Sequence, residues 1–349
     1  MEKDLERHTE ALIKLGHLLS ADTPEKKAVL EKAQQHNPWF TSDNTASALG
    51  ALSSSLREGL LEKWLQPYAP LPGKRRSPLD IGLVLAGNIP LAGFHDILCV
   101  LLSGHRAVVK LSSQDKQLTP WFLEKIREAC PDYAGQLDVR DRLDKIDAVI
   151  ATGSNNSARF FDFYFGKYPH IIRKNRNSAA VLSGGETQGE LQELGRDIFL
   201  YFGLGCRNVS KLFFPRGYDP GALLSALEPF RDIVQHHKYA NNFSYQRTIL
   251  QMNGIPHYDS GFLLLSENAS YSSPIATLYY EYYNSEEDLA GRLRADAELL
   301  QCLVSKGASF PGSIPFGQTQ SPALWDYADN ADTLKFLLSL DPDPARADG

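Results

Sequence analysis

The sequence predicts an α/β protein built on a doubly wound parallel sheet. From about residue 79, short apolar runs alternate with helical patterns, and this alternation is typical of parallel βαβ units. Asn88, Lys110 and Gly153 lie at or just after the ends of three such runs, which is where doubly wound sheets bind ligands. The chain has 349 residues, enough for two domains that each bury a core.

The composition is that of an ordinary soluble protein, with 43% hydrophobic and 22% charged residues. A net charge of −6 argues against nucleic acid as a partner, because phosphate binding needs a basic surface. The charged start of the chain does not fit a signal peptide, and no apolar stretch approaches the roughly 20 residues that span a bilayer. Four widely spaced cysteines without CxxC spacing suggest neither a disulfide framework nor a zinc site. We therefore expect a cytoplasmic protein with reduced thiols, no membrane span and no metal.

Residues 1 to about 70 are predicted to be helical. An apolar stripe along Leu5–Leu18 indicates the first helix. Thr23 is placed to cap a second helix that has Pro24 at its first position, and the leucines of Leu52–Leu65 indicate a third. A stretch rich in proline and arginine, 70–76, then predicts an exposed connection.

The remaining elements follow from the same patterns. In the first half we predict strands at Leu79–Leu85, Arg106–Leu111 and Lys145–Ala151, and helices at Leu91–Ser103, Thr119–Cys130 and Asn155–Tyr168. In the second half we predict strands at Ser178–Leu182, Lys211–Pro215 and Tyr271–Tyr283, and helices at Leu191–Phe202, Asp219–Leu227 and Glu286–Leu303. The C-terminal part is predicted to hold a strand at Thr333–Leu338 and a disordered polar tail, Asp341–Gly349.

The segment Thr152-Gly153-Ser154 joins a predicted strand to the N-terminus of a predicted helix. Free backbone amides and a hydroxyl at such a junction can hold a phosphate, and an ordinary helix cap explains the same residues equally well. No GxGxxG loop occurs at any of the predicted strand ends, so the usual glycine-rich phosphate loop is not expected.

Cys206 is the main candidate for a reactive side chain. Gly203 and Gly205 break the preceding helical pattern and allow a sharp turn, and Cys206 follows directly. A thiol on such a turn can face a ligand, and the cation of Arg207 would favour its thiolate. The alternative is a small residue packed at the end of a helix.

In their order, these motifs resemble the aldehyde dehydrogenase superfamily, and in particular its acyl-CoA reductase branch, which includes the fatty acid reductase of bacterial luminescence. The similarity covers roughly residues 75–340. The segments that carry it are Ala86–Pro90, similar to Pro-x-Asn-x-Pro; Gly104–Ser113, similar to Gly-Asn-x-Val-Val-x-Lys-Pro-x-Glu; Ile150–Ser154, similar to Phe-Thr-Gly-Ser; Gly203–Cys206, similar to Gly-Gln-x-Cys; and Ile314–Gly317 with the strand near Lys335, similar to Pro-Phe-Gly and the closing strand.

The resemblance implies an aldehyde-dehydrogenase-like fold, with a doubly wound cofactor domain and an α/β catalytic domain. The expected parts are 1–175, holding the N-terminal helices and the dinucleotide-binding sheet, 176–322, holding the nucleophile, and 323–349, holding a C-terminal strand and tail. An exposed apolar strand invites pairing with another chain, so a homodimer is a further expectation.

The resemblance also implies a role for each site residue. Cys206 would attack a thioester carbonyl, and the side chain of Asn88 together with the Cys206 amide would stabilise the oxyanion. The cofactor-binding residues would be Lys110, Ser112, Ser113, Gly153 and Ser154. The implied activity is the NADPH-dependent reduction of an acyl-CoA, or of an acyl-carrier thioester, to a fatty aldehyde.

Three departures from the family pattern bear on this activity. Ile172 stands where hydrolytic members have a glutamate base, which favours reduction over oxidation to an acid, although Glu186 or Glu190 remains open as a substitute. Ser113 stands where NAD-preferring relatives have a ribose-binding glutamate, so we predict NADPH over NADH. The family's Glu-x-Phe-Gly-Pro matches Ser270–Pro274, where only the proline remains, so the nicotinamide ribose must be held differently.

Several other groups carry a functional and a structural interpretation. The remaining thiols are expected to pack in the interior: Cys99, Cys130 and Cys302. Neighbouring cations could contact coenzyme A phosphates or form a solvated edge: Arg173, Lys174 and Arg176. Two aromatic segments could line an acyl tunnel or pack in a core or interface: Phe160–Phe165 and Tyr279–Tyr283. His236-His237-Lys238 could bind a metal or a phosphate, although adjacent side chains diverge on a helix.

Two other functions remain open at this point. One is an NAD(P)-dependent aldehyde dehydrogenase that forms acids, which requires a general base. The other is a binding protein that kept the fold without catalysis, which would neither bind NADPH nor depend on Cys206.

Overall fold

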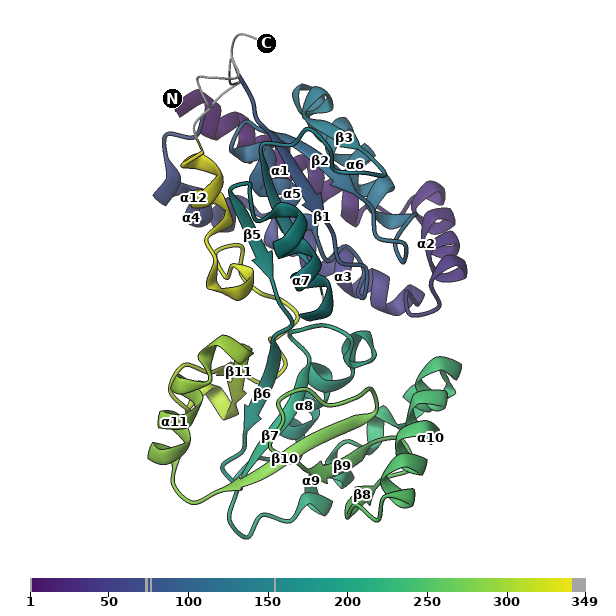
Figure 1. Ribbon diagram of the computed structural model, residues 1–349. Coiled ribbons are helices and arrows are strands. Elements are labelled where there is room, and N and C mark those ends of the chain that lie inside the picture. Colours follow the sequence, from purple (N-terminus) through teal and green to yellow (C-terminus); the bar gives the residue numbers. More distant parts are fainter. Residues whose placement is uncertain (1, 73–74, 76, 154, 341–349) are drawn as a thin grey trace. The chain divides into compact units, whose positions relative to one another are not determined.

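A computed structural model describes residues 2–72, 75, 77–153 and 155–340. The chain forms two compact units (Figure 1). Unit 1 comprises Met1–Lys174 and Ala323–Gly349, and unit 2 comprises Asn175–Pro322. None of the described helices is long and apolar enough to cross a membrane.

The sheet of unit 1 has five parallel strands in the order β3-β2-β1-β4-β5. These strands are β1 (Asp80–Val84), β2 (Arg106–Lys110), β3 (Leu137–Val139), β4 (Ala148–Thr152) and β5 (His170–Arg173). The chain leaves β1 in one direction to form β2 and in the other to reach β4, so the sheet is doubly wound with its switch point between β1 and β4. The predicted fold class is confirmed for this unit.

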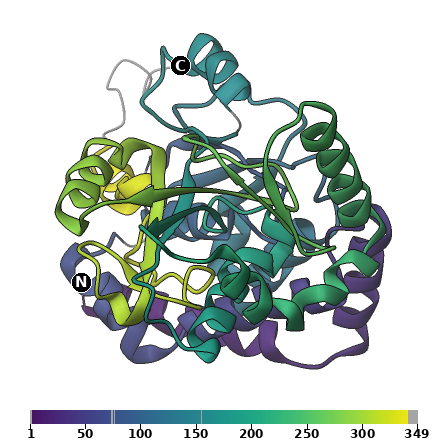
Figure 2. The ribbon, with the colours of Figure 1, turned by 90° about the horizontal axis from the view of Figure 1, so that it is seen from below.

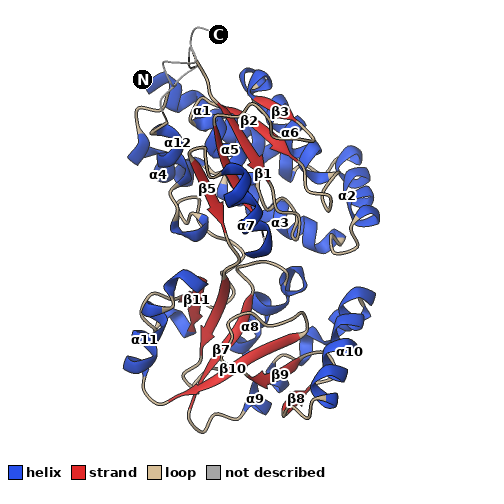
Figure 3. Cartoon of the chain, viewed as in Figure 1, coloured by secondary structure: helices blue, strands red, loops and turns tan. Residues whose placement is uncertain are grey.

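Helices cover both faces of this sheet (Figure 3). They are α1 (Glu2–Ser20), α2 (Pro24–His36), α3 (Ser42–Ser55), α4 (Glu58–Leu65), α5 (Phe94–Leu102), α6 (Leu118–Ala129), α7 (Asn155–Phe165) and α12 (Thr333–Leu338). One large core joins the sheet to the N-terminal helices, α5, α6 and α12, and it includes Ile150. A smaller core around Val149, on the opposite face of β4, is covered by Phe161 and Phe165 of α7.

The N-terminal helices form much as the sequence indicates. The Thr23 hydroxyl accepts a hydrogen bond from the amide of Lys26, 3.1 Å away, so Thr23 caps α2 as predicted. The predicted helix over Leu52–Leu65 is wrong as a single element, because the chain leaves helical geometry at Leu56 and Arg57. The leucine spacing continues across this break because both helices pack on the same core.

Unit 2 is built on a seven-stranded sheet in the order β12-β11-β6-β7-β10-β9-β8. Its strands are β6 (Asn177–Val181), β7 (Val209–Pro215), β8 (His257–Asp259), β9 (Leu264–Glu267), β10 (Thr277–Tyr283), β11 (Leu300–Ser305) and β12 (Ile314–Pro315). All pairings are parallel except β8 with β9. Its helices are α8 (Gln188–Phe199), α9 (Pro220–Ala226), α10 (His237–Met252) and α11 (Glu286–Ala295). In Figures 1 and 2, α11 lies toward the β11 side of the sheet and α10 toward the β8 side.

Two predicted elements are wrong in type. The helix predicted over Glu286–Leu303 ends at Ala295, and its apolar end is β11, because a short apolar run fits a buried strand as well as a helix. The strand predicted at Thr333–Leu338 is the helix α12, which begins where the Asp332 carboxylate accepts from the amide of Lys335, 2.9 Å away. This segment therefore offers no strand for pairing with another chain, and the homodimer stays a prediction that rests on the resemblance alone. The predicted disordered tail lies outside the described residues.

Candidate active site

Several predicted cofactor residues lie at the carboxyl-terminal ends of the strands of unit 1. Val84 is in register with Lys110 on one side and with Ala151 on the other, so the ends of β1, β2 and β4 lie level. A Cβ atom added to Gly87 would lie 2.3 Å from the Ser112 hydroxyl, so the turn that leads to Asn88 touches the loop after Lys110. The structure thus brings the Asn88 turn, Lys110 and Ser112 together where ligands bind in doubly wound sheets.

Gly153 lies where β4 leads into α7. A Cβ there would lie 2.8 Å from both the Phe161 ring and the Ser157 side chain, so only glycine allows the helix to pack this closely on the strand end. Ser154, the predicted phosphate-binding hydroxyl, lies outside the described residues. Ser113 is exposed, and its carbonyl oxygen lies 2.9 Å from the ring nitrogen Nε2 of His36. At Gly87 and at Gly153 the backbone is therefore approached closely by side chains of the same strand-end region.

In unit 2, Cys206 follows a left-handed turn of the backbone. The helix α8 ends at Phe199 rather than at Phe202, and the next residues include Tyr201, Phe202 and Gly203 with φ of 55°, 58° and 75°. Two of these are not glycine, and each such residue costs about 1–3 kcal/mol. Strain of this kind persists where the surrounding structure enforces it, often at functional sites. Cys206 is exposed, which fits a reactive thiol and not a packed one.

A second thiol is linked to the Cys206 turn through one hydroxyl group. Ser178 of β6 donates a hydrogen bond from its hydroxyl to the Cys206 carbonyl oxygen, 2.9 Å away. The sulfur of Cys302, from β11, lies 3.0 Å from the same hydroxyl oxygen, so the Cys302 thiol donates to Ser178. Burial raises the pKa of Cys302 to about 11, so it stays protonated at neutral pH. Cys302 was predicted to be a core residue, but it is only half-buried, and it supports the Cys206 turn through Ser178.

The two carboxylates left open as a general base lie at the wrong end of α8. Glu186 accepts hydrogen bonds from the amides of Ser183 and Gly184, at 2.6 and 3.0 Å. Glu190 caps the helix through Thr187, whereas Cys206 follows the other end. A twelve-residue helix is about 18 Å long, so neither carboxylate is beside the thiol.

Arg173 fits neither interpretation of the cations near residue 174, a contact to coenzyme A phosphates or a solvated edge. Its guanidinium binds both carboxylate oxygens of Asp96, at 2.5 and 2.9 Å, and the Thr333 hydroxyl at 2.8 Å. The Arg173 side chain is only 5% exposed. Arg176 donates to the carbonyl oxygen of Leu300 at 3.4 Å, and Lys174 is exposed.

His236 and its neighbours have local structural partners. His236 caps α10 by accepting from the amide of Tyr239, and its ring lies 4.3 Å from that of Phe202, centre to centre. The ring of His237 stacks on His236 at 5.2 Å. Within the described part of the chain, no group of three His, Cys, Asp or Glu side chains could hold a metal ion.

The aromatic segments divide between surface and core. In α7, Phe160, Phe163 and Tyr164 are 64%, 81% and 62% exposed, so these three do not pack in a core, and the interface and tunnel alternatives stay predictions. In β10, Tyr280 is buried in the core of unit 2, as the structural alternative predicts. Cys99 and Cys130 are also buried as predicted.

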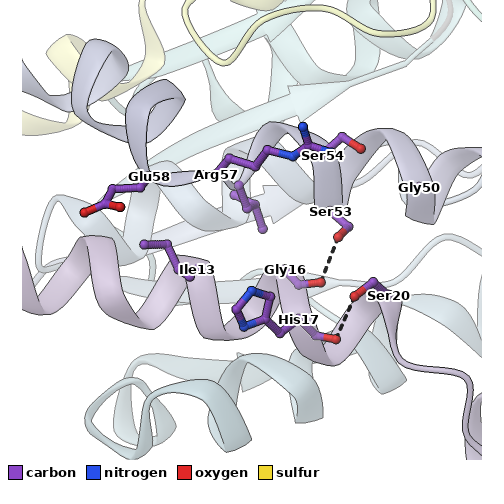
Figure 4. A pocket seen from close by; sticks show the side chains of 10 residues that line it. Ile13, Gly16, His17, Ser20, Gly50, Ser53, Ser54, Arg57 and Glu58 are labelled. Atoms are coloured by element: carbon purple, nitrogen blue, oxygen red, sulfur yellow. Dashed lines mark hydrogen bonds between the residues drawn. The ribbon is translucent and has the colours of Figure 1, made fainter.

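A groove of about 530 Å³ lies in unit 1 between α1, α3 and the start of α4 (Figure 4). Its lining includes His17 and Arg57, but none of the predicted site residues. The Ser53 and Ser20 hydroxyls in the lining donate to backbone carbonyl oxygens of α1, at 2.8 and 2.9 Å.

Comparison with known proteins defines the fold as that of the aldehyde dehydrogenases. No protein-family model and no curated protein sequence matches the chain. Among solved structures, the chain is similar to an aldehyde dehydrogenase from Mycobacterium tuberculosis complexed with NAD+ (TM-score 0.64, 16% identity, covering 90% of this chain and 76% of that one). It is also similar to an aldehyde dehydrogenase from Brucella melitensis biovar abortus 2308 (TM-score 0.65, 12% identity, 88% and 73%) and to an indole-3-acetaldehyde dehydrogenase complexed with NAD+ (TM-score 0.65, 14% identity, 89% and 73%).

Proposed function

We propose that this protein is a nicotinamide-dependent oxidoreductase that reduces an acyl-CoA, or another acyl thioester, to an aldehyde. The observation that carries the proposal is the exposed Cys206, placed after a strained turn on the fold of the aldehyde dehydrogenases. Solved structures with this fold include NAD+ complexes of an aldehyde dehydrogenase and of an indole-3-acetaldehyde dehydrogenase, which supports chemistry at the aldehyde level.

The proposed reaction passes through an acyl-enzyme. The Cys206 thiolate would attack the thioester carbonyl, the carbon–sulfur bond to the carrier would break, and the carrier would leave as a thiolate that takes a proton from water. The backbone amide of Cys206 would stabilise the oxyanion at each stage, and the family resemblance implies the same role for the side-chain amide of Asn88. NADPH, held by the residues of unit 1 named below, would supply the hydride for reduction of the acyl carbon. The bond to Cys206 then breaks, which releases the aldehyde and restores the thiolate.

Unit 1 provides the proposed cofactor site. Lys110 and Ser113 would bind the adenosine ribose and its 2′-phosphate, with Ser112 beside them, and Gly153 and Ser154 would accept the pyrophosphate. The level strand ends and the two glycine-dependent close contacts support this assignment. Ser113 carries no negative charge that would repel a 2′-phosphate, so NADPH is the proposed cofactor.

The positions of the two carboxylates left open as a base favour reduction over acid formation. Glu186 and Glu190 are held at the far end of α8 from Cys206, and Ile172 occupies the position matched to the hydrolytic glutamate. If neither of these carboxylates activates water, the acyl-enzyme is poorly set up for hydrolysis. Oxidation of an aldehyde to an acid is the second candidate, and it predicts acid formation from aldehyde without coenzyme A.

The decisive experiment is mass spectrometry of the intact protein after incubation with acyl-CoAs of several chain lengths and no NADPH. We expect an increase in mass equal to one acyl group, lost in Cys206→Ser and retained in the control Cys130→Ser, which removes a buried thiol. An unmodified wild-type protein, or an acyl group on another cysteine, would contradict the proposal.

A further inference from the structure

The side chain of Asn208 joins the end of α8 to the Cys206 turn. Its amide nitrogen donates to the carbonyl oxygens of Asp197, Ile198 and Leu200, at 3.0, 3.4 and 2.8 Å. Its amide oxygen accepts from the backbone N–H of Gly205, at 2.8 Å. Asn208 is 2% exposed, so these bonds form away from solvent.

These bonds satisfy groups that the end of a helix leaves open. The last four carbonyl groups of an α-helix have no partner within the helix, and they carry the negative end of its dipole. After α8 the chain enters left-handed geometry at Tyr201, so the helix does not continue to cover them. An asparagine side chain offers two N–H donors and an acceptor oxygen, the set that this junction uses.

We infer that Asn208 is a positioning residue for the Cys206 nucleophile: it keeps the carbonyl groups at the end of α8 engaged and fixes the Gly205 amide, so that the turn presents the thiolate in one orientation. The inference rests on the proposed role of Cys206. Removal of Asn208 would take this partner from the carbonyl groups and from the Gly205 amide and would release the strained turn, and both effects would disturb the position of the thiolate.

Asn208→Asp and Asn208→Ala test the two parts of this role. Aspartate keeps the shape but replaces the donors with a negative charge, whereas alanine removes the bonds without adding charge. The matched control is Asn253→Ala, since Asn253 also donates to a carbonyl oxygen near the end of a helix (Ile249, 2.9 Å) but lies at α10.

The measurement is the rate at which iodoacetamide alkylates Cys206 between pH 5 and 10, read by mass spectrometry of the peptide that contains it. We expect the pH midpoint of alkylation to rise by about one unit in Asn208→Asp, so that the rate at pH 7 falls about tenfold. Asn208→Ala should slow acyl transfer from acyl-CoA to Cys206 at least as strongly, and Asn253→Ala should match the wild type in both assays.

The outcomes separate this inference from the proposed function. A wild-type Cys206 that accepts no acyl group contradicts the proposed function. A wild-type Cys206 that is acylated, with folded Asn208 variants that react at the same rates and the same pH midpoint, contradicts the inference.

If the Asn208 variants do not fold, amide hydrogen exchange in the wild-type protein tests the inferred role of Asn208. The bond to Asn208 predicts that the Gly205 amide exchanges at least tenfold more slowly than in an unfolded chain. Exchange of Gly205 at the unfolded rate would overturn the inference.

Discussion

His105 shows how one buried side chain makes the stability of unit 1 depend on pH. Its ring is fully buried; Nδ1 accepts from the amide of Leu79 and Nε2 donates to the carbonyl oxygen of Leu337, both at 3.1 Å. A proton on Nδ1 would face the Leu79 N–H, so the ring is neutral. Burial, aided by the charge of Arg75, lowers the pKa of His105 to about 4.

We therefore predict that acid destabilises the protein between about pH 6.5 and pH 4. In this window the unfolded chain protonates His105 and the folded chain does not, so the free energy of unfolding falls as pH falls. The loss approaches about 3 kcal/mol, since the pKa difference is 6.5 − 4, or about 2.5 units. Urea unfolding at pH 7.5 and pH 5 measures this loss of stability.

The variant His105→Gln is the control. Burial also lowers the pKa of His8, so the stability of the variant should still fall somewhat with pH. An equal loss of unfolding free energy in the wild type and the variant would contradict the prediction.

The choice between NADPH and NADH is also argued at a single residue. In Ser113→Glu, a carboxylate at this exposed position would repel a 2′-phosphate and bind ribose hydroxyls. We expect the ratio of kcat/KM for NADPH to that for NADH to fall at least tenfold, measured by steady-state kinetics. Ser77→Glu, another serine of unit 1 and outside the proposed site, is the control. An unchanged ratio in Ser113→Glu would remove Ser113 from the cofactor site.

The candidate nucleophile can be predicted from the sequence, but the residues that hold its turn in place cannot. Cys206 stands out because glycines frame it locally. Ser178, Cys302 and Asn208 act through contacts that form only after folding: Ser178 and Cys302 are 124 residues apart. No local sequence pattern indicates such a contact. In addition, residues of β11 were predicted to be helical, so the sequence did not place Cys302 in a strand next to Ser178.

At the level of elements, α12 shows why an apolar run alone is ambiguous. Leu334 and Leu337 are fully buried and three residues apart, the spacing of one helical face, whereas Lys335 between them is exposed. The sequence signal for a helix was Asp332, three residues before Lys335, in the position of an N-cap.

A comparison of leucines tests the helix directly. Leu337→Ala should lower the free energy of unfolding by about 2–5 kcal/mol, because it opens a cavity in the core of unit 1. Leu338→Ala should cost clearly less, since that side chain is only partly buried. Denaturant unfolding of both variants measures the difference. A strand would place Leu334, Phe336 and Leu338 on one face, so a larger loss from Leu338→Ala would contradict α12.

Central strands were more predictable than edge strands. β1, β2, β4 and β7 are apolar runs buried in their sheets, and each overlaps its predicted range. The short strands β3, β8 and β12 lie at sheet edges and have two or three residues, too few for a periodic pattern to show.

At the scale of the whole molecule, the alternation of strands and helices correctly predicts a doubly wound parallel sheet. It does not show that the last part of the chain completes unit 1. Leu324, Tyr327 and Leu334 belong to the same core as the N-terminal helices, and the Trp64 ring N–H donates to the Tyr327 hydroxyl at 2.8 Å. This pairing joins residues 263 positions apart, which sequence patterns do not report.

The division into units predicts that residues 175–322 fold alone. This fragment is continuous and contains two hydrophobic clusters that flank its sheet. We expect cooperative urea unfolding of the fragment by circular dichroism. The fragment 1–174 is the comparison, and it should fold poorly because it lacks the core residues that follow position 322. A stable 1–174 with an unstructured 175–322 would contradict the division.

Because both ends of the chain build unit 1, the ribosome makes its parts at separate times. Unit 2 has 148 residues (322 − 175 + 1), so about 7–30 s pass between emergence of the two portions at 5–20 residues per second. During that interval, the apolar surface of unit 1 that Leu334 and Leu337 later cover stays exposed. The inserted unit is therefore complete first, and this apolar surface of the earlier half stays uncovered until residues 323–340 have emerged.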